Sequence, residues 1–293
     1  CTFRVDAADG SAYALRINLP GARTAAEIRS ELTWQEAVCT ETDIPAPRPV
    51  RTRDGDLVVQ AAAPGVPEPR LCNLSTWVPG RTLRRAVTPE SFRQLGELSA
   101  RLHQHGATFE PPEGFTLPRL NTVLPASRPD RLFAGERPTE ITPDAYALLQ
   151  RINAAVEEEL ARLFQPGNRP QVVHGDLHWW NVLMYRGKLQ PIDFEDCAWG
   201  FPAQDIAITF YYVLWDERYD SLLAAFREGY ERIQAWPEDF PGQLDLLLGQ
   251  RALDLINLLL DSPYREDREL IPEFVGIVEQ TYRSRFERAM MRS

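Results

Sequence analysis

The densest group of chemically capable side chains lies between residues 172 and 196 of this 293-residue chain. A first block, 172–183, carries the run His-Gly-Asp-Leu-His and then an asparagine. Within this block Asp176 and Asn181 are five positions apart across a loop, so both side chains can face one site. In a second block Asp193 follows an apolar strand segment. The spacing predicts that the three side chains meet.

Two carboxylates and an amide supply only oxygen ligands, which suit a hard divalent cation such as Mg²⁺. A carboxylate that does not bind the metal can accept a proton from an attacking hydroxyl group. A base, a metal clamp and positioning groups are the parts that phosphoryl transfer requires. The residues therefore predict a phosphoryl-transfer site.

The first 78 residues are expected to form a β-rich lobe with one helix, because apolar and polar residues alternate there. Thr24 and Glu27 form a capping-box pattern that predicts a helix over 25–41, and the prolines that follow it predict its end. The strands are expected at 3–5, 13–17, 57–59 and 70–78.

Residues 79–293 are expected to form a larger, mainly helical lobe. Thr-Pro pairs predict helix starts at Pro89 and Pro143, with ends near Gly106 and Gly167. The remaining segments are expected to be a loop at 107–141, short strands over 172–200, and helices from 203 to the end, with breaks at Pro237 and Pro263. The predicted fold class is α+β with two lobes.

The composition limits the function classes. A net charge of −10 disfavours general nucleic-acid binding. No apolar run is long enough to span a membrane, and four cysteines without a CxxC pair favour a reducing cytoplasm. The first residue is not methionine and lies in an expected strand, so we expect that the small lobe lacks its start. Of 32 lysine and arginine residues, only Lys188 is a lysine.

Together, the His-Gly-Asp-Leu-His run, Asn181, the Ile-Asp-Phe-Glu-Asp run at 192–196 and the segment 200–207 resemble the aminoglycoside phosphotransferase and choline kinase superfamily. This superfamily has a bilobal, protein-kinase-like fold. The resemblance extends over nearly the whole chain, because residues 13–16 (Tyr-Ala-Leu-Arg) stand where kinases carry Val-Ala-Ile-Lys.

The resemblance implies an ATP- and Mg²⁺-dependent phosphotransferase. Asp176 would be the catalytic base that orients the acceptor hydroxyl, and Asn181 with Asp193 would hold Mg²⁺ against the ATP phosphates. Asp205 would be structural, with a bond into the catalytic loop.

In the small lobe, the resemblance places Ala14 near the adenine and backbone groups around Trp77 at its edge. Glu31 lies in the helix that should supply the glutamate paired with the phosphate-binding cation. That cation is Arg16 instead of lysine, and Lys188 cannot replace it, because it lies in the turn between the two catalytic blocks. Either Arg16 does the ordinary work in an arginine-rich chain, or the nucleotide site is altered.

The histidines could also serve a metal hydrolase. In the kinase-like site, His174 and His178 would be hydrogen-bonding members of the catalytic loop, and His178 could also assist the chemistry. In a metal hydrolase both would instead be ligands together with Asp176, but such sites need more histidines, and only His103 and His105 remain.

The sequence leaves two more functions open. A non-catalytic nucleotide-binding pseudokinase would explain Arg16 and the absence of a visible glycine-rich loop, which should precede Cys1. A kinase acting on protein Ser/Thr would use the same site. The expected acceptor is a small molecule with a hydroxyl group, such as an aminoglycoside, an amino alcohol or a metabolite, and neither nucleic acid nor membrane is an expected partner. The oligomeric state is left open.

Overall fold

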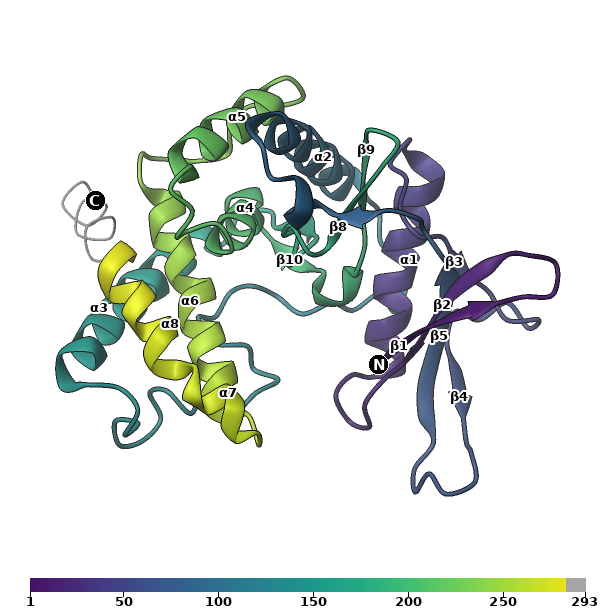
Figure 1. Ribbon diagram of the computed structural model, residues 1–293, viewed down its shortest axis with the longest axis horizontal. Coiled ribbons are helices and arrows are strands. Elements are labelled where there is room, and N and C mark those ends of the chain that lie inside the picture. Colours follow the sequence, from purple (N-terminus) through teal and green to yellow (C-terminus); the bar gives the residue numbers. More distant parts are fainter. Residues whose placement is uncertain (283–293) are drawn as a thin grey trace.

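The structure, a computed structural model, describes residues 1–282 and has two lobes (Figure 1). The elements of the small lobe are β1 (Thr2–Asp6), β2 (Ala12–Ile17), α1 (Ala25–Glu41), β3 (Pro49–Val50), β4 (Val59–Ala61) and β5 (Arg70–Thr76). The strands form an antiparallel sheet in the order β1-β2-β5-β3, with β4 also paired to β5. This lobe has the β-rich character with a single helix that the sequence predicts.

Helix α1 has the predicted bounds because its start is capped as expected. Thr24 Oγ1 accepts from the Glu27 N–H at 3.2 Å, and the Glu27 carboxylate accepts from the Thr24 N–H at 2.7 Å. The helix buries Leu32 in the small-lobe core and Trp34 in the large core. It therefore connects the cores of the two lobes.

The helices of the large lobe are α2 (Pro89–Thr108), α3 (Pro143–Leu163), α4 (Pro202–Tyr211), α5 (Tyr219–Glu231), α6 (Gln243–Asp261), α7 (Arg265–Glu269) and α8 (Ile271–Ile277). A π-helical turn, Val278–Tyr282, follows α8. Helices α2 and α5 pack closely, because Gly96 on α2 faces the backbone carbonyl of Phe226. Over residues 1–282, no helix combines the length and apolar character needed to cross a bilayer.

Two helix predictions were wrong in detail. Helix α3 ends at Leu163, before Gly167, because the Asn168 side-chain amide donates hydrogen bonds to the carbonyl oxygens of Arg162 and Leu163. The helical run expected from 203 also breaks between α4 and α5, where the Asp216 carboxylate accepts from the backbone and guanidinium of Arg218. The prediction for residues 283–293 lies outside the described part of the chain.

The short strands of the large lobe position the two polar blocks. They are β6 (Arg81–Thr82), β7 (Gln171–Val173), β8 (Val182–Tyr185), β9 (Lys188–Pro191) and β10 (Ala198–Gly200), with 3-10 turns η1 (Leu83–Ala86) and η2 (Phe194–Asp196). Strand β7 pairs with β10, and β8 pairs with β6 and β9. The loops 174–181 and 192–197 therefore run side by side, and the Ile192 N–H donates to the Asn181 carbonyl at 2.8 Å.

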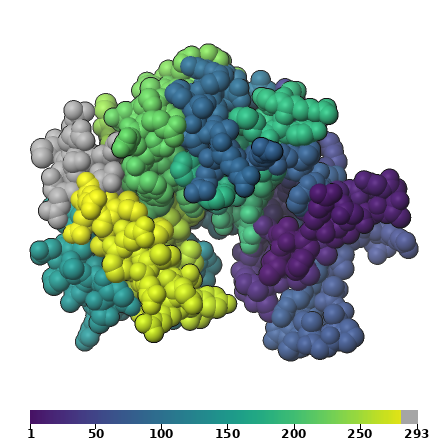
Figure 2. Space-filling model, viewed as in Figure 1, coloured from purple at the N-terminus to yellow at the C-terminus, as the bar shows by residue number. Residues whose placement is uncertain are grey.

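The site faces the space between the lobes. Figure 2 shows a hollow between the small-lobe strands, in purple and blue, and the yellow helices α7 and α8. Strand β5 ends at Thr76 and β6 begins at Arg81, so the connection between the lobes lies at residues 77–80. The predicted division between residues 78 and 79 falls within this connection and stays a prediction.

Candidate active site

A buried aspartate fixes the start of the loop 174–181. Asp205 Oδ1 accepts from the Gly175 N–H at 2.7 Å, which is the bond into the loop that the sequence analysis expected. Asp205 Oδ2 lies 2.9 Å from His103 Nε2, and His103 Nδ1 lies 2.9 Å from the Tyr230 hydroxyl. Burial opposes ionisation of Asp205, but the bond and charge of His103, together with His174 and the Gly175 N–H, outweigh it and lower the pKa of the carboxyl. An ionised, fully buried carboxylate therefore anchors the loop.

The histidines that a metal hydrolase would need are used elsewhere. His103 belongs to the Asp205 network, and His105 Nδ1 accepts from the Trp34 indole N–H at 3.2 Å. Within residues 1–282, no cluster of three or more His, Cys, Asp or Glu side chains could hold a metal ion. The geometry does not support a binuclear hydrolase site.

Both carboxylate oxygens of Asp176 have partners. Oδ2 accepts from Asn181 Nδ2 at 2.7 Å and lies 3.2 Å from His178 Nε2, and Oδ1 accepts from Arg251 Nη2 at 2.7 Å. Burial opposes ionisation, but the bond from His178 and the charge of Arg251 lower the pKa of Asp176. Asp176 is therefore a charged, oriented carboxylate, as a general base requires.

The two loop histidines have defined tautomers. His174 Nδ1 accepts from the Asp176 N–H at 3.3 Å, so its Nε2 carries the proton and donates to the Ile192 carbonyl at 3.2 Å. His178 Nδ1 accepts from the Trp180 N–H at 3.1 Å, so its Nε2–H faces Asp176. Burial lowers the pKa of His174, which keeps its imidazole neutral. Both side chains are placed for hydrogen bonding.

Asn181 and Asp193 offer oxygen ligands from two loops that are joined by the bond from the Ile192 N–H to the Asn181 carbonyl. The Asn181 amide nitrogen donates to the backbone carbonyl and carboxylate of Asp176, which leaves its side-chain oxygen for a metal. Asp193 has a left-handed backbone, with φ of 62°, and its side chain is exposed. Mg²⁺ is commonly bound by one or two carboxylates together with substrate phosphates, so this small ligand set fits it.

Arg16 extends from β2 to the second block. Its Nη2 lies 2.7 Å from Asp193 Oδ1 and its Nη1 lies 2.7 Å from Glu195 Oε2. Burial opposes the charge, but Asp193 and Glu195 outweigh it and raise the pKa of the guanidinium. Arg16 is therefore a permanent cation beside the expected metal site.

Glu31 does not pair with Arg16 as the sequence analysis expected. Its Oε2 lies 2.5 Å from Arg23 Nη1, because Arg23 precedes the start of α1 and lies beside Glu31. The Glu31 side chain is only 4% exposed and that of Arg23 is 14% exposed, and burial raises the pKa of the Glu31 carboxyl. Glu195 occupies the place beside Arg16 that was assigned to Glu31.

The two expected adenine contacts lie on the small lobe and the connection. Ala14 is half-buried on β2, in register with Ser75 of β5. The Trp77 N–H already donates to the Ala12 carbonyl at 2.9 Å, so the adenine edge needs other backbone groups near Trp77. The exposed Trp77 ring lies 5.2 Å from the Arg4 guanidinium. The roles of Ala14 and Trp77 stay predictions.

Sequence reasoning missed the part that α6 plays in the site. The structure places Arg251 of this helix on Asp176. Arg251 also donates to the Tyr212 hydroxyl at 2.7 Å, and the Tyr212 ring lies 3.9 Å from the His178 ring. The signal in the sequence was a pair of charged residues, three positions apart, in an otherwise leucine-rich helix.

The comparisons with known proteins agree with this geometry. A model of the phosphotransferase enzyme family matches residues 2–239. An uncharacterized protein of Synechocystis sp. is 28% identical over 198 residues, which cover 67% of this chain and 52% of that protein. The chain therefore spans about half the length of this curated relative.

Two solved structures are similar to the whole fold. An amicoumacin kinase in complex with AMP-PNP, Ca²⁺ and Ami has a TM-score of 0.75 at 19% identity, over 96% of this chain and 85% of that one. A microcompartment-associated aminopropanol kinase has a TM-score of 0.71 at 23% identity, over 94% of this chain and 86% of that one. At these identities the likeness establishes the fold, and the predicted bilobal kinase-like architecture is confirmed.

Proposed function

The chain belongs to the phosphotransferase enzyme family, and we propose that it transfers the γ-phosphoryl group of Mg·ATP to a hydroxyl group of a small molecule. The observation that carries the proposal is the arrangement of Asp176. Its carboxylate is ionised and is held by Asn181 and His178, and the loop that carries it is bonded through the Asn181 carbonyl to Ile192, the neighbour of Asp193. A base next to a metal-binding pair is the arrangement that phosphoryl transfer needs.

Each residue has a defined task in this proposal. Asn181 and Asp193 would hold Mg²⁺, which when bound would neutralise charge on the phosphates. Asp176 would take the proton of the acceptor hydroxyl while the acceptor oxygen bonds to the γ-phosphorus and ADP leaves. Arg16 would contact phosphate oxygens from the small lobe.

One observation favours a pseudokinase as the second candidate. Arg16 is bound to both Asp193 and Glu195, so nucleotide phosphates and metal would have to compete for these groups. In a pseudokinase this pairing would persist, and no acceptor would accelerate the release of ADP.

An ADP-release screen tests the proposal. The wild type and the variants Asp176→Asn and Asp193→Asn are assayed with aminoglycosides, amino alcohols, sugars and a generic protein substrate. AMP-PNP binding is measured with and without Mg²⁺. The exposed Asp54, which lies in a turn far along the chain from the site, gives the control variant Asp54→Asn.

We expect Asp176→Asn to lower turnover by about 10²–10⁴-fold, the usual contribution of a general base, while AMP-PNP binding persists. Asp193→Asn should weaken binding mainly in the presence of Mg²⁺, and Asp54→Asn should behave as the wild type. Near-normal turnover in Asp176→Asn would refute the base assignment. Nucleotide binding without turnover on any acceptor would favour the pseudokinase.

A further inference from the structure

Arg251 occupies the position that an acceptor hydroxyl needs. Asp176 Oδ2 is taken by Asn181 and His178, so a hydroxyl that donates a proton to Asp176 must approach Oδ1. Arg251 Nη2 lies 2.7 Å from this oxygen. The acceptor therefore has to share Oδ1 with Arg251 or displace it.

The charge of Arg251 is poorly compensated without Asp176. The Arg251 side chain is only 15% exposed, and its other carboxylate contact, Asp254 Oδ2, is longer at 3.3 Å. Asp254 is also shared, because Arg128 Nη1 lies 3.0 Å from its Oδ1. The Arg251 Nε is buried without a hydrogen-bond partner among the described residues. A buried guanidinium that loses its main carboxylate is unfavourable unless another anion replaces it.

We propose that Arg251 determines acceptor specificity by binding a carboxylate group of the acceptor when the acceptor hydroxyl takes its place on Asp176. The proposal rests on the proposed phosphoryl transfer and names its substrate class as small hydroxy acids. The planar guanidinium suits a carboxylate, which can accept two parallel N–H bonds from it. Because Arg251 and Asp176 are in contact, the hydroxyl and carboxylate of the acceptor must lie within about 6 Å of each other.

The surrounding charges favour this class over a simple amine. Arg251 and Arg128 pair with Asp176 and Asp254, so each of these carboxylates already has an arginine partner. The buried Asp196 also lies near Arg251, and burial raises the pKa of its carboxyl to about 6, so it holds its negative charge less readily than an ordinary aspartate. An ammonium group placed here would approach two guanidinium groups. A carboxylate instead replaces the contact that Arg251 loses.

Matched acceptor pairs test the proposal. Glycolate, 3-hydroxypropionate and 4-hydroxybutyrate are compared with their primary amides, which keep the hydroxyl group and lose the negative charge. The variants are Arg251→Gln, which removes the charge, and Arg251→Lys, which keeps it without the planar fork. The control is Arg131→Gln, because Arg131 also pairs with a carboxylate of α6, Asp261 at 2.9 Å.

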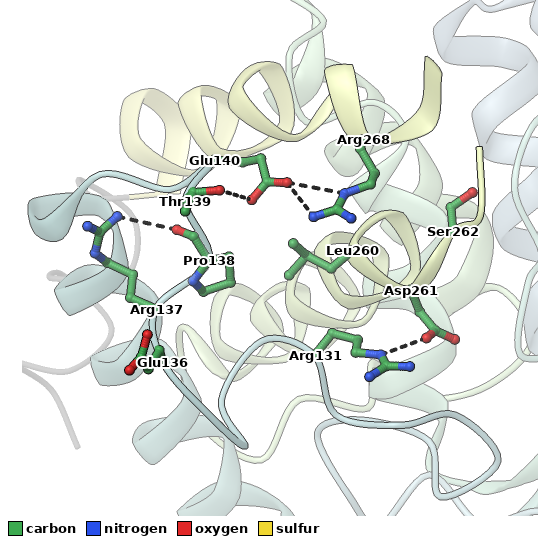
Figure 3. A pocket seen from close by; sticks show the side chains of 10 residues that line it. All are labelled: Arg131, Glu136, Arg137, Pro138, Thr139, Glu140, Leu260, Asp261, Ser262 and Arg268. Carbon is green, nitrogen blue, oxygen red and sulfur yellow. Dashed lines mark hydrogen bonds and ion pairs between the residues drawn. The ribbon is translucent and has the colours of Figure 1, made fainter. Parts of the chain in front are cut away.

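Arg131 is remote from Asp176. It lines a separate cavity of about 460 Å³ between the loop 136–140 and the end of α6 (Figure 3). Asp261 lies seven positions, about two helical turns, beyond Asp254. Arg131→Gln thus removes the arginine partner of a carboxylate on α6, the helix that carries Arg251, but at a place that does not contact Asp176.

We expect the wild type to prefer at least one acid over its amide by at least about tenfold in kcat/KM. Arg251→Gln changes the surroundings of Asp176, so it should lower kcat on acid and amide alike, but it should also raise the KM for the acid much more than the KM for the amide and so lose the preference, and Arg251→Lys should keep part of it. Arg131→Gln should keep the wild-type preference. Equal use of acids and amides by the wild type, or an equal loss of kcat/KM on both in Arg251→Gln, overturns the proposal.

Thermal shifts separate this proposal from the proposed function. In the presence of AMP-PNP and Mg²⁺, an acid should raise the Tm of the wild type and of Arg131→Gln more than its amide does, but not that of Arg251→Gln. This result without any turnover would support Arg251 as an anion-binding residue while the proposed function fails. If no acid raises the Tm or is phosphorylated, the hydroxy-acid proposal fails, even if another alcohol is phosphorylated. Arg251→Lys gives the comparison if Arg251→Gln does not fold.

Discussion

Arg16 Nη2 lies 2.7 Å from Asp193 Oδ1, so a cation of the small lobe is bound to the carboxylate expected to hold the metal. Glu195 holds the second nitrogen of the same guanidinium at 2.7 Å. The pairing joins β2 to the loop 192–197 across the expected nucleotide site. If Asp193 holds the metal as proposed, Arg16 would be the cation of the small lobe that can contact the phosphates.

Substitution of Arg16 tests whether it is the phosphate ligand. Arg16→Ala should lower turnover by about 10²–10³-fold or raise the KM for ATP sharply, because one preorganised charge donor is lost. Arg16→Lys keeps a point charge and should retain much more activity. Steady-state ADP release at varied ATP measures both effects. Small and equal effects in the two variants would mean that the phosphate-binding cation lies elsewhere.

A second prediction separates Glu195 from Glu31 as the partner that orients Arg16. Glu195→Gln should raise the KM for ATP, while the free energy of unfolding changes by less than about 1 kcal/mol, because the side chain is 42% exposed. Glu31→Gln should instead destabilise the fold by on the order of 3 kcal/mol, because it removes the carboxylate that compensates the largely buried charge of Arg23.

Urea unfolding and ATP kinetics are measured on both variants, with kinetics at a temperature where both are folded. If Glu31→Gln raises the KM for ATP more than Glu195→Gln does, the pairing expected from the sequence operates in the working enzyme. The contact between Arg16 and Glu195 would then not be the productive one.

Local chemistry made much of the fold predictable from the sequence. The reciprocal bonds of Thr24 and Glu27 depend on residues three apart, so α1 could be given its observed bounds. The loop that carries Asp176 and Asn181 could also be predicted from local sequence, because apolar strand segments lie directly beside it in the chain. The bond from Gly175 to Asp205 was expected only from the family resemblance, because thirty positions separate the two residues.

Pairings between distant segments could not be predicted. The sequence analysis expected only Glu31 beside Arg16, and it is the relative position of the two lobes that lets Asp193 and Glu195 bind Arg16 while Arg23 binds Glu31. The contact of Arg251 with Asp176 spans 75 positions and depends on how α6 packs against α4. The break after α4 was missed because it contains neither proline nor glycine.

The buried His174 predicts a pH-dependent stability. Burial lowers its pKa below the ordinary 6.5, so the unfolded chain takes up a proton that the folded chain excludes. The stabilising contribution of the neutral His174 to the free energy of unfolding should therefore have its full value above pH 6.5. It should fall as the pH drops below 6.5, by at most about 1.4 kcal/mol per pH unit. Urea midpoints between pH 5 and 8 measure the slope.

His174→Asn is the matched variant, because its side-chain oxygen can accept from the Asp176 N–H in place of Nδ1. The variant should be less stable at pH 8, since the bond to the Ile192 carbonyl is lost, but its stability should fall less between pH 6.5 and pH 5. An unchanged slope would show that other groups cause the pH dependence.

Gly175 gives the last prediction, because two separate reasons require glycine there. Its φ is +77°, and an added Cβ would lie 2.0 Å from the Asp196 carbonyl oxygen. The loops 174–181 and 192–197 therefore come into close contact at Gly175. Gly175→Ala should therefore displace Asp176 from Asn181 and abolish ADP release. The free energy of unfolding should fall by well over the 1–2 kcal/mol, roughly, that a left-handed backbone alone costs a residue with a Cβ.

Gly187 separates the two reasons. It has the same φ of +77°, but no neighbouring atom of the described residues lies within 4 Å of an added Cβ, so Gly187→Ala contains the strain without the clash. This variant should lose about 1–2 kcal/mol in urea unfolding and keep its activity, because Gly187 lies in the turn at the end of β8 and β9 opposite to the end that leads to Asn181 and Asp193. If both variants lose equal stability and both remain active, the close contact between Gly175 and Asp196 does not control the geometry of the base.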